Sequence, residues 1–312
     1  MFSRTVALAA ILAAMATGAA GAADLPAKAP AKAASPPPFF FVNNNSISYH
    51  YEFTATNPGA GQTPKDVLTF THFDVWQYGT NFLNVDWLKA TSSSTPTATG
   101  TEGYTEIYGF FRSTFGWNEI FNTKQFAMGP LEDISFMVGA DLNTDNTALG
   151  SAKRSIEGGL TFSFTAPYKG LINLSPNIYK EWQHDGFAPP VTDGSVDFHT
   201  TWGFEYLWVQ PLGFLPPSVP LTFTAFGTVH GPKGCGEPCF PGPGLNRTTE
   251  WYSQENLSLD VGQMIMGKPG MYSVWVGYRY WLNKFGIDPN QPFGAFGFTK
   301  ESTWLLGATM TF

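Results

Sequence analysis

Apolar and polar side chains alternate along this chain with a period of two, and this pattern constrains the fold more than any other feature. In residues 303–312 every second position is apolar, and small or hydroxylic residues fill most positions between; the apolar set is Trp304, Leu306, Ala308, Met310 and Phe312. A period of two puts successive side chains on opposite faces of a β-strand. The segment therefore predicts a strand with one wholly apolar face, which must be shielded from water.

The same alternation recurs between residues 46 and 312. It is clear in residues 46–56, 82–89, 104–113, 133–142, 154–164, 195–208, 248–262 and 271–286, and less clean in residues 66–77, 171–183 and 219–230. Clusters of Gly, Pro, Asn, Ser and Thr separate these segments and predict turns and loops. With the terminal strand, the sequence predicts about 12 strands, and an even number is typical of bacterial barrels closed within one chain.

One of the less clean segments carries a specific irregularity. In residues 66–77 the alternation changes phase near His72. A change of phase indicates either a β-bulge or an incorrect assignment of the register at that position.

The composition narrows the kind of β-protein. Charged residues make up 13% of the chain, against about 25% in ordinary soluble domains, while aromatic residues make up 16%, with 28 Phe, 12 Tyr and 10 Trp. A soluble protein of this composition would expose extended apolar patches to water. The composition suits a protein whose outer surface faces lipid and whose interior is polar.

We therefore predict an all-β fold, a transmembrane antiparallel up-and-down β-barrel. Closure of the sheet satisfies every backbone N–H and C=O group, which hydrocarbon demands. A soluble β-sandwich alternates in the same way but carries more charge on its outer faces. Many Tyr and Trp near the predicted strand ends match two interfacial aromatic belts. The predicted location is the outer membrane of a Gram-negative bacterium. The chain is expected to cross this membrane many times and to contact its lipids.

The N-terminal region predicts export and a spacer. Residues 1–23 combine Arg4, an apolar run over residues 6–16 and a small-residue site at 21–23, which is typical of a secretory signal peptide. The apolar run is short for a membrane anchor, which needs roughly 20 residues. Residues 24–45 begin with DLPAKAPAKAASPPP and predict an extended periplasmic spacer rich in Pro, Ala and Lys. The barrel is predicted over residues 46–312.

Signals for catalysis are weak. The 5 histidines are dispersed, and the chain has no HExxH or GxSxG motif and no paired Cys/His spacing. We therefore expect no enzyme activity, no cofactor and no metal site. Cys235 and Cys239, in the loop sequence CGEPC, predict a local disulfide in an oxidising compartment. The net charge of −7 argues against a nucleic-acid partner.

The polar faces of the predicted strands define the expected lumen. They mix acids and amides with aromatic and basic side chains; the set is Asn84, Asp86, Glu106, Tyr108, Phe110, Arg112, Asp141, Glu157, Glu205, Glu250, Tyr252, Arg279, Trp281 and Asn283. Amides and carboxylates bind hydroxyl groups, and aromatic faces stack on flat rings as they do on nucleic-acid bases. The composition of this face suits a sugar attached to a planar heterocycle. Aromatic residues that only fill a narrow barrel are the alternative.

Three stretches resemble a known family: WQYGTNFLNVDWLK (76–89), EIYGFFRSTF (106–115) and YRYWLNKFG (278–286) are similar to the Tsx-type nucleoside channels of the bacterial outer membrane. The order of the motifs matches, and the likeness spreads across most of residues 46–312. The resemblance implies a monomeric barrel of about 12 strands, passive and selective uptake of nucleosides, and use of the outer loops by bacteriophage. The spacer and the CGEPC loop depart from the family pattern.

The resemblance also carries over individual residues of the matching stretches, which are Asn81, Asn84, Asp86, Tyr108, Arg112, Trp281 and Asn283. With Glu106, Phe110 and Arg279 from the inward face, they form the predicted substrate-binding set. Two alternatives stay open. One is a general or different-solute pore, for sugars or aromatic acids; the other is a barrel lipid hydrolase or a structural anchor.

Overall fold

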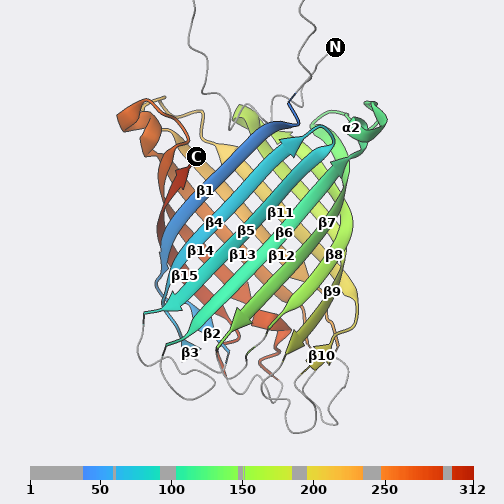
Figure 1. Cartoon of the computed structure of the whole chain (residues 1–312), viewed down its shortest axis with the longest axis vertical. Helices are drawn as coiled ribbons and strands as arrows, with labels where there is room; N and C mark the ends of the chain where they lie inside the picture. The colour runs from blue at the N-terminus through green and yellow to red at the C-terminus, as the bar shows by residue number, and fades with distance from the viewer. Residues whose placement is uncertain are drawn as a thin grey trace, which may run out of the picture.

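Twelve long antiparallel strands close on one another in the computed structural model of this protein (Figure 1). The structure describes residues 38–58, 61–91, 103–146, 150, 152–184, 195–234, 247–290 and 297–312. The barrel strands are β1 (Phe40–Glu52), β4 (Lys65–Trp76), β5 (Gly79–Ala90), β6 (Thr105–Gly116), β7 (Leu131–Asp145), β8 (Arg154–Ala166), β9 (Gly170–His184), β11 (Thr201–Pro211), β12 (Leu221–His230), β13 (Glu250–Asp260), β14 (Tyr272–Leu282) and β15 (Glu301–Thr311).

Hydrogen bonding between neighbours runs round the whole ring. Each barrel strand pairs antiparallel with the next along the chain, and β1 pairs with both β4 and β15, which joins the first strand to the last. A closed ladder leaves no sheet edge in the hydrocarbon and satisfies the backbone of every spanning segment. The predicted up-and-down barrel of about 12 strands is confirmed.

The predicted start of the barrel is wrong by six residues. Phe40–Asn45 already belong to β1, because their pairing with β4 continues to Trp76 at the far end of that strand. The predicted signal peptide and most of the predicted spacer lie outside the described residues.

The two rims of the barrel differ in the connections they carry. The upper rim of Figure 1 holds the start of β1, the end of β15 and several short turns, such as the two residues between β4 and β5. The lower rim holds longer connections, including residues 91–104, 231–249 and 283–300. Short turns face the periplasm and long loops face the exterior in barrels of the outer membrane. We therefore assign the upper rim to the periplasm.

Smaller elements decorate the rims. At the lower rim, β2 (Thr56–Asn57) and β3 (Gly61–Gln62) form a hairpin, β10 (Ser195–Asp197) pairs antiparallel with the end of β9, and η3 (Lys284–Gly286) follows β14. At the upper rim lie α2 (Trp117–Phe121), η1 (Pro167–Lys169) and η2 (Gly262–Met266). No helix among the described residues is long and apolar enough to span a membrane.

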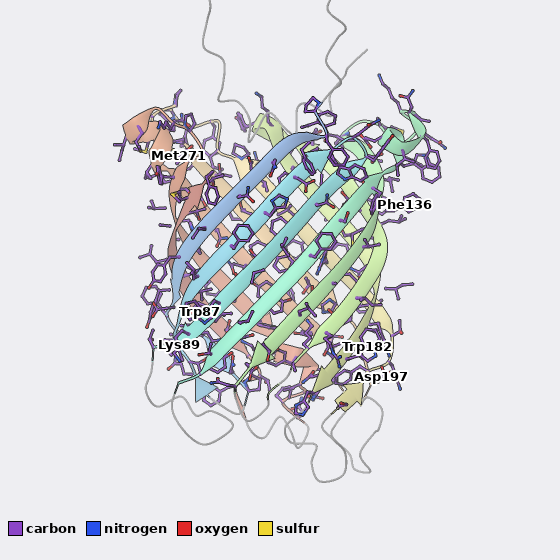
Figure 2. The ribbon with its side chains drawn as sticks, in the orientation of Figure 1. Trp87, Lys89, Phe136, Trp182, Asp197 and Met271 are labelled. Carbon is purple, nitrogen blue, oxygen red and sulfur yellow. The ribbon has the colours of Figure 1, made fainter. Side chains whose placement is uncertain are left out.

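The outer wall of the barrel is predominantly apolar. Large apolar side chains remain exposed there on every barrel strand except β12, from Trp87 on β5 and Ile178 on β9 to Trp304 on β15. Figure 2 shows Phe136 on the upper part of the wall and Trp87 and Trp182 near the lower rim. Such a surface is unfavourable in water and suits the hydrocarbon of a bilayer. The chain is therefore a multi-pass protein of the outer membrane.

A hydrogen-bonded chain of polar residues interrupts this apolar wall near the periplasmic rim. His72 contacts Asn45 (2.9 Å) and Asp74 (3.1 Å), Asn81 donates to Asp74 (2.9 Å), and Ser113 donates to Asn81 (2.7 Å). These residues share the face of Leu68, Phe70 and Trp87, which look outward. On β13, Ser253 donates to Glu255 in a smaller interruption of the same wall.

The predicted bulge at His72 is wrong. Strand β4 pairs with β5 in one unbroken register from Lys65 to Trp76, and the irregularity lies instead in β1, between Phe40 and Val42. The change of phase in the sequence is a real inversion of polarity. Beyond His72 the inner face becomes apolar, where Val42, Phe73 and Val75 pack together, and the polar residues turn outward.

Candidate functional site in the lumen

Neutral polar side chains line the periplasmic half of the lumen. Hydroxyl groups pair across neighbouring strands there: Ser48 with Thr309 (2.8 Å) and Thr161 with Ser175 (2.9 Å). The indole of Trp275 donates to Thr309 (3.2 Å) in the same region. This half therefore offers mainly hydroxyl donors and acceptors, with Asp133 as a charged residue near the rim.

An arginine with three carboxylates occupies the middle of the lumen. The Arg112 guanidinium, on β6, binds Asp141 on β7 (2.7 Å), Glu157 on β8, and Glu205 on β11, where the nitrogen–oxygen distances are 2.6 and 2.9 Å. In ring order β6 and β11 are separated by three strands, so this side chain reaches across the lumen rather than along its wall. It narrows the passage at this level.

Gly139 on β7 leaves space for the Arg112 side chain to cross the lumen. A Cβ on Gly139 of β7 would lie 2.7 Å from Arg112 Cδ and 2.8 Å from Glu157 Oε1, closer than real contacts allow. Glycine at this position lets the arginine pass over β7. One guanidinium cannot neutralise three carboxylates. Lys153 adds a second positive charge 3.5 Å from Asp141, but the carboxylates still outnumber the bases in this group.

Aromatic rings gather on two opposite walls of the lumen. On β5 and β6, the Phe82 and Phe110 rings lie 5.4 Å apart, and the Arg112 guanidinium lies 5.4 Å from the Phe110 ring. On β13 and β14, the Tyr252 and Trp281 rings meet edge to face at 5.3 Å. The ring order puts six steps between β6 and β13 in both directions, so the two patches lie on opposite walls, with Phe110 in the middle of the lumen and Trp281 at its outer mouth. A flat solute that moves along the lumen meets one aromatic patch after the other.

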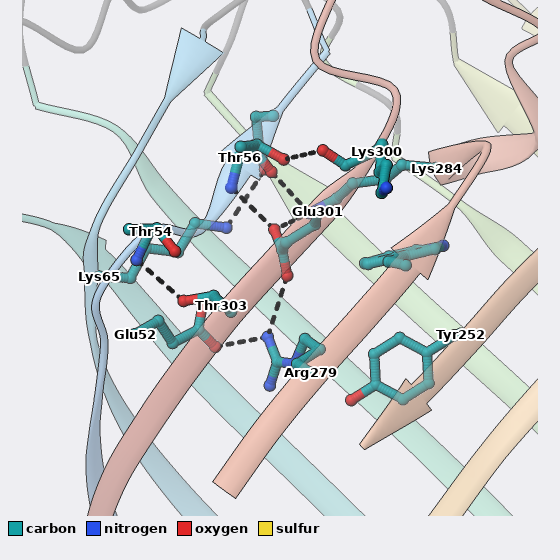
Figure 3. Close-up of polar contacts among 12 residues, drawn as sticks. Glu52, Thr54, Thr56, Lys65, Tyr252, Arg279, Lys284, Lys300, Glu301 and Thr303 are labelled. Carbon is teal, nitrogen blue, oxygen red and sulfur yellow. Dashed lines mark hydrogen bonds and ion pairs between the residues drawn. The ribbon is translucent and has the colours of Figure 1, made fainter. Parts of the chain in front are cut away.

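A second ion-pair group lies at the outer mouth (Figure 3). Arg279 on β14 binds Glu52 on β1 (2.5 Å), lies 3.8 Å from Glu301 on β15, and donates to Gln254 on β13 (2.9 and 3.1 Å). The Glu301 carboxylate also binds Lys284 (3.0 Å). Both carboxylates are fully buried at their side chains, and burial of ions is tolerated only when they are paired this closely.

Further pairs continue this band around the mouth. Lys65 binds Glu106 (3.2 Å), and Lys233 binds Glu181 (2.6 Å) and approaches Glu250 (3.8 Å). The Trp281 indole donates to Glu250 (2.8 Å). All of these charged side chains are at least nine-tenths buried. The outer end of the lumen is therefore tightly packed with ion pairs, whereas neutral groups predominate in the periplasmic half.

Eight of the ten predicted substrate-binding residues face the lumen. Asn84 and Asp86 are bonded to one another and to Thr71 and Thr69 on the neighbouring strand. These two, with Tyr108, Phe110 and Arg112, lie in the middle, and Glu106, Arg279 and Trp281 lie at the outer mouth. Lys153 lies 5.9 Å from the Tyr108 ring. The predicted residues are therefore divided between two separate levels of the lumen.

The remaining two predictions are wrong. Asn81 faces outward, because it lies three positions before Asn84, an odd number, and the side chains of a strand alternate. Asn283 lies past the end of β14, in a left-handed conformation with φ of 51°, and donates to the backbone oxygen of Thr249 (2.9 Å). It shapes a loop at the outer rim. The predicted disulfide between Cys235 and Cys239 lies outside the described residues.

Sequence reasoning missed several charged residues of the outer mouth. Glu52 and Glu301 lie at strand ends, at alternating positions that face inward, and this alternation could have predicted them as lumen residues. Lys153, Lys233 and Lys284 lie in connections outside the strands, where alternation gives no information. Among the described residues, no group of three or more His, Cys, Asp or Glu is arranged to hold a metal ion.

Comparisons with known proteins give structural likenesses alone. No protein-family model and no curated protein matches the chain. A solved outer-membrane channel from Pseudomonas putida F1 is similar over 92% of this chain and 100% of its own, with a TM-score of 0.46 and 10% identity. OccK11 (OpdR) of Pseudomonas aeruginosa is similar over 86% of this chain and 95% of its own, with a TM-score of 0.36 and 10% identity.

Proposed function

We propose that this protein is an outer-membrane channel for the passive, selective uptake of nucleosides. The observation that carries the proposal is the pairing, within one lumen, of opposed aromatic patches with carboxylate and amide groups. A nucleoside presents a flat heterocycle to the rings and sugar hydroxyls to the polar groups. Each contact is weak, which suits a channel, because a tight site blocks passage.

The charges of the lumen support a neutral or cationic solute over an anionic one. Carboxylates are in excess around Arg112, and the bases at the outer mouth are already paired with acids. A phosphorylated nucleotide would meet this negative potential as it passed Arg112. We therefore assign nucleosides, rather than nucleotides, as the transported class.

Adjacent phenylalanines on β6 provide the test. Phe110 faces the lumen, and its neighbour Phe111 faces lipid and is 38% exposed. Stacking of a base on an aromatic side chain contributes about 1–3 kcal/mol, so Phe110→Ala is expected to weaken half-saturation of adenosine uptake by roughly 5- to 150-fold. Uptake is measured in proteoliposomes with labelled adenosine, and Phe111→Ala is the matched control.

Three outcomes decide the proposal. Saturable adenosine uptake that Phe110→Ala weakens and Phe111→Ala leaves intact supports it. Equal, unsaturable permeation of adenosine and a sugar of matched size contradicts it and favours a general pore. Absence of any solute flux from a correctly folded barrel contradicts transport altogether.

A further inference from the structure

The outer wall holds an apolar groove near the periplasmic rim. It has a volume of about 450 Å³, and its floor is the lipid-facing side of β1, β14 and β15, through Ile47, Val274, Ala308 and Met310. The segment η2 forms one side of it through Ile265 and Met266. In Figure 1 this segment is the orange coil at the upper left, and Figure 2 labels Met271 beside it.

The connection that carries η2 is held firmly against the barrel. Both oxygens of the Asp260 carboxylate accept backbone N–H bonds, from Gln263 (2.8 Å) and Gly270 (2.5 Å). The segment is a π-helix, a rare form that is frequent at functional sites, and it ends at Gly267 with φ of 61°. The groove is therefore a built feature of the wall and not a gap under a loose loop.

The side chains of this connection are unsuited to water. Met264, Ile265 and Met266 are 49%, 80% and 51% exposed, and all three are apolar. They lie at the periplasmic end of strands whose outer faces meet hydrocarbon, so the groove is continuous with the lipid-facing wall. Apolar side chains at this depth are stable when acyl chains cover them.

A basic residue lies in the connection that forms one side of the groove. The backbone N–H of Lys268 donates to Gly262, which lines the groove (3.0 Å), and the lysine side chain is exposed. The periplasmic surface of the membrane carries phosphate groups, which attract a lysine at that level. The apolar groove and the lysine together suit an amphipathic molecule that has an acyl chain and a phosphate group.

We propose that this groove is a binding site for a phospholipid of the periplasmic leaflet. One acyl chain lies against Ala308 beneath Ile265 and Met266, and the headgroup phosphate pairs with Lys268. Ala308 sets the depth of the groove, because its neighbours on the same face of β15, Leu306 and Met310, are larger. The site is independent of the lumen and of what the lumen transports.

The test is lipid binding to the purified full chain. The barrel is delipidated in mild detergent and titrated with phosphatidylglycerol, and bound lipid is counted by native mass spectrometry. We expect one retained lipid on the native protein and at least a tenfold loss of affinity in Ala308→Trp. Ala140→Trp is the matched control, since Ala140 is a small lipid-facing residue of β7, outside the groove.

Two further variants keep the outcome interpretable. Ile265→Ser opens the side of the groove without altering a strand, and Lys268→Ala removes the cation; each is expected to weaken binding. Retention by Ala308→Trp and Ile265→Ser equal to that of the native protein overturns the proposal, and so does an equal loss in Ala140→Trp. Preferential retention of lipopolysaccharide over phospholipid overturns the assignment to the periplasmic leaflet.

Discussion

At the scale of single residues, Arg112 organises the middle of the lumen. It is the one base in contact with Glu157 and Glu205 among the described residues, and its side chain is only 14% exposed. Removing one partner from a buried ion pair costs about 3–5 kcal/mol, because the other charge stays behind without compensation. Here three carboxylates would face one another across the lumen.

Arg112→Gln is therefore expected to lower the free energy of unfolding by about 3–5 kcal/mol. Urea unfolding of the barrel in lipid vesicles measures this. Arg154→Gln is the control, since Arg154 is exposed at the end of β8, and a change within about 0.5 kcal/mol is expected there. Equal effects of the two substitutions would contradict the assigned role of Arg112.

Asn81 and Asn84 test which face of β5 lines the lumen. Asn84 supports Asp86 in the lumen, whereas Asn81 joins the polar chain on the outer wall. Asn84→Ala is expected to change the half-saturation of adenosine uptake by roughly 5-fold, as for the loss of one hydrogen bond of about 1 kcal/mol. Asn81→Ala is expected to leave uptake unchanged while lowering stability. The opposite pattern would mean that the register of β5 is misassigned.

At the scale of elements, the strands were predictable from sequence because a barrel strand has one lipid face and one polar face. That rule gave the strand count and most inward residues. It failed at His72, where hydrogen bonds between four strands satisfy polar groups on the outer wall. It also could not supply Lys233 and Lys284 of the outer mouth, because these lie in connections whose path depends on the closed barrel.

The short helix α2 carries an ionisable pair at the periplasmic rim. Burial and the neighbouring Asp133 carboxylate raise the pKa of Glu119 to about 7, from an ordinary value of 4.5. A carboxyl whose pKa is raised by folding stabilises the fold below its unfolded pKa, and that contribution disappears as the pH rises through the folded pKa. The window for this group is therefore from about pH 4.5 to about pH 7.

Glu119→Gln is expected to remove this part of the pH dependence, because an amide does not ionise. Urea unfolding midpoints at several pH values between 4 and 8 measure it. Asp288→Asn, at the opposite rim, is the control. It is expected to show the same dependence of stability on pH as the native protein. A native protein whose stability rises steadily over this window, and a Glu119→Gln variant that follows it, would contradict the account.

At the scale of the whole molecule, acids outnumber bases among the described residues of the lumen and its mouth. The carboxylates are Glu52, Asp86, Glu106, Asp141, Glu157, Glu181, Glu205, Glu250 and Glu301, and the bases are Lys65, Arg112, Lys153, Lys233, Arg247, Arg279 and Lys284. A narrow acidic passage concentrates cations. The reversal potential across a bilayer with a KCl gradient is expected to show cation selectivity, and a clear anion preference would contradict this distribution of charge.

We propose that flat, hydroxylated solutes pass along the aromatic patches on opposite walls of the lumen. Single-channel current in a planar bilayer, recorded while adenosine or ribose is added, tests it most directly. The account predicts that adenosine interrupts the current in a concentration-dependent way, that ribose does so far less, and that Phe110→Ala relieves the interruption. A current that adenosine leaves unchanged at every concentration would contradict it.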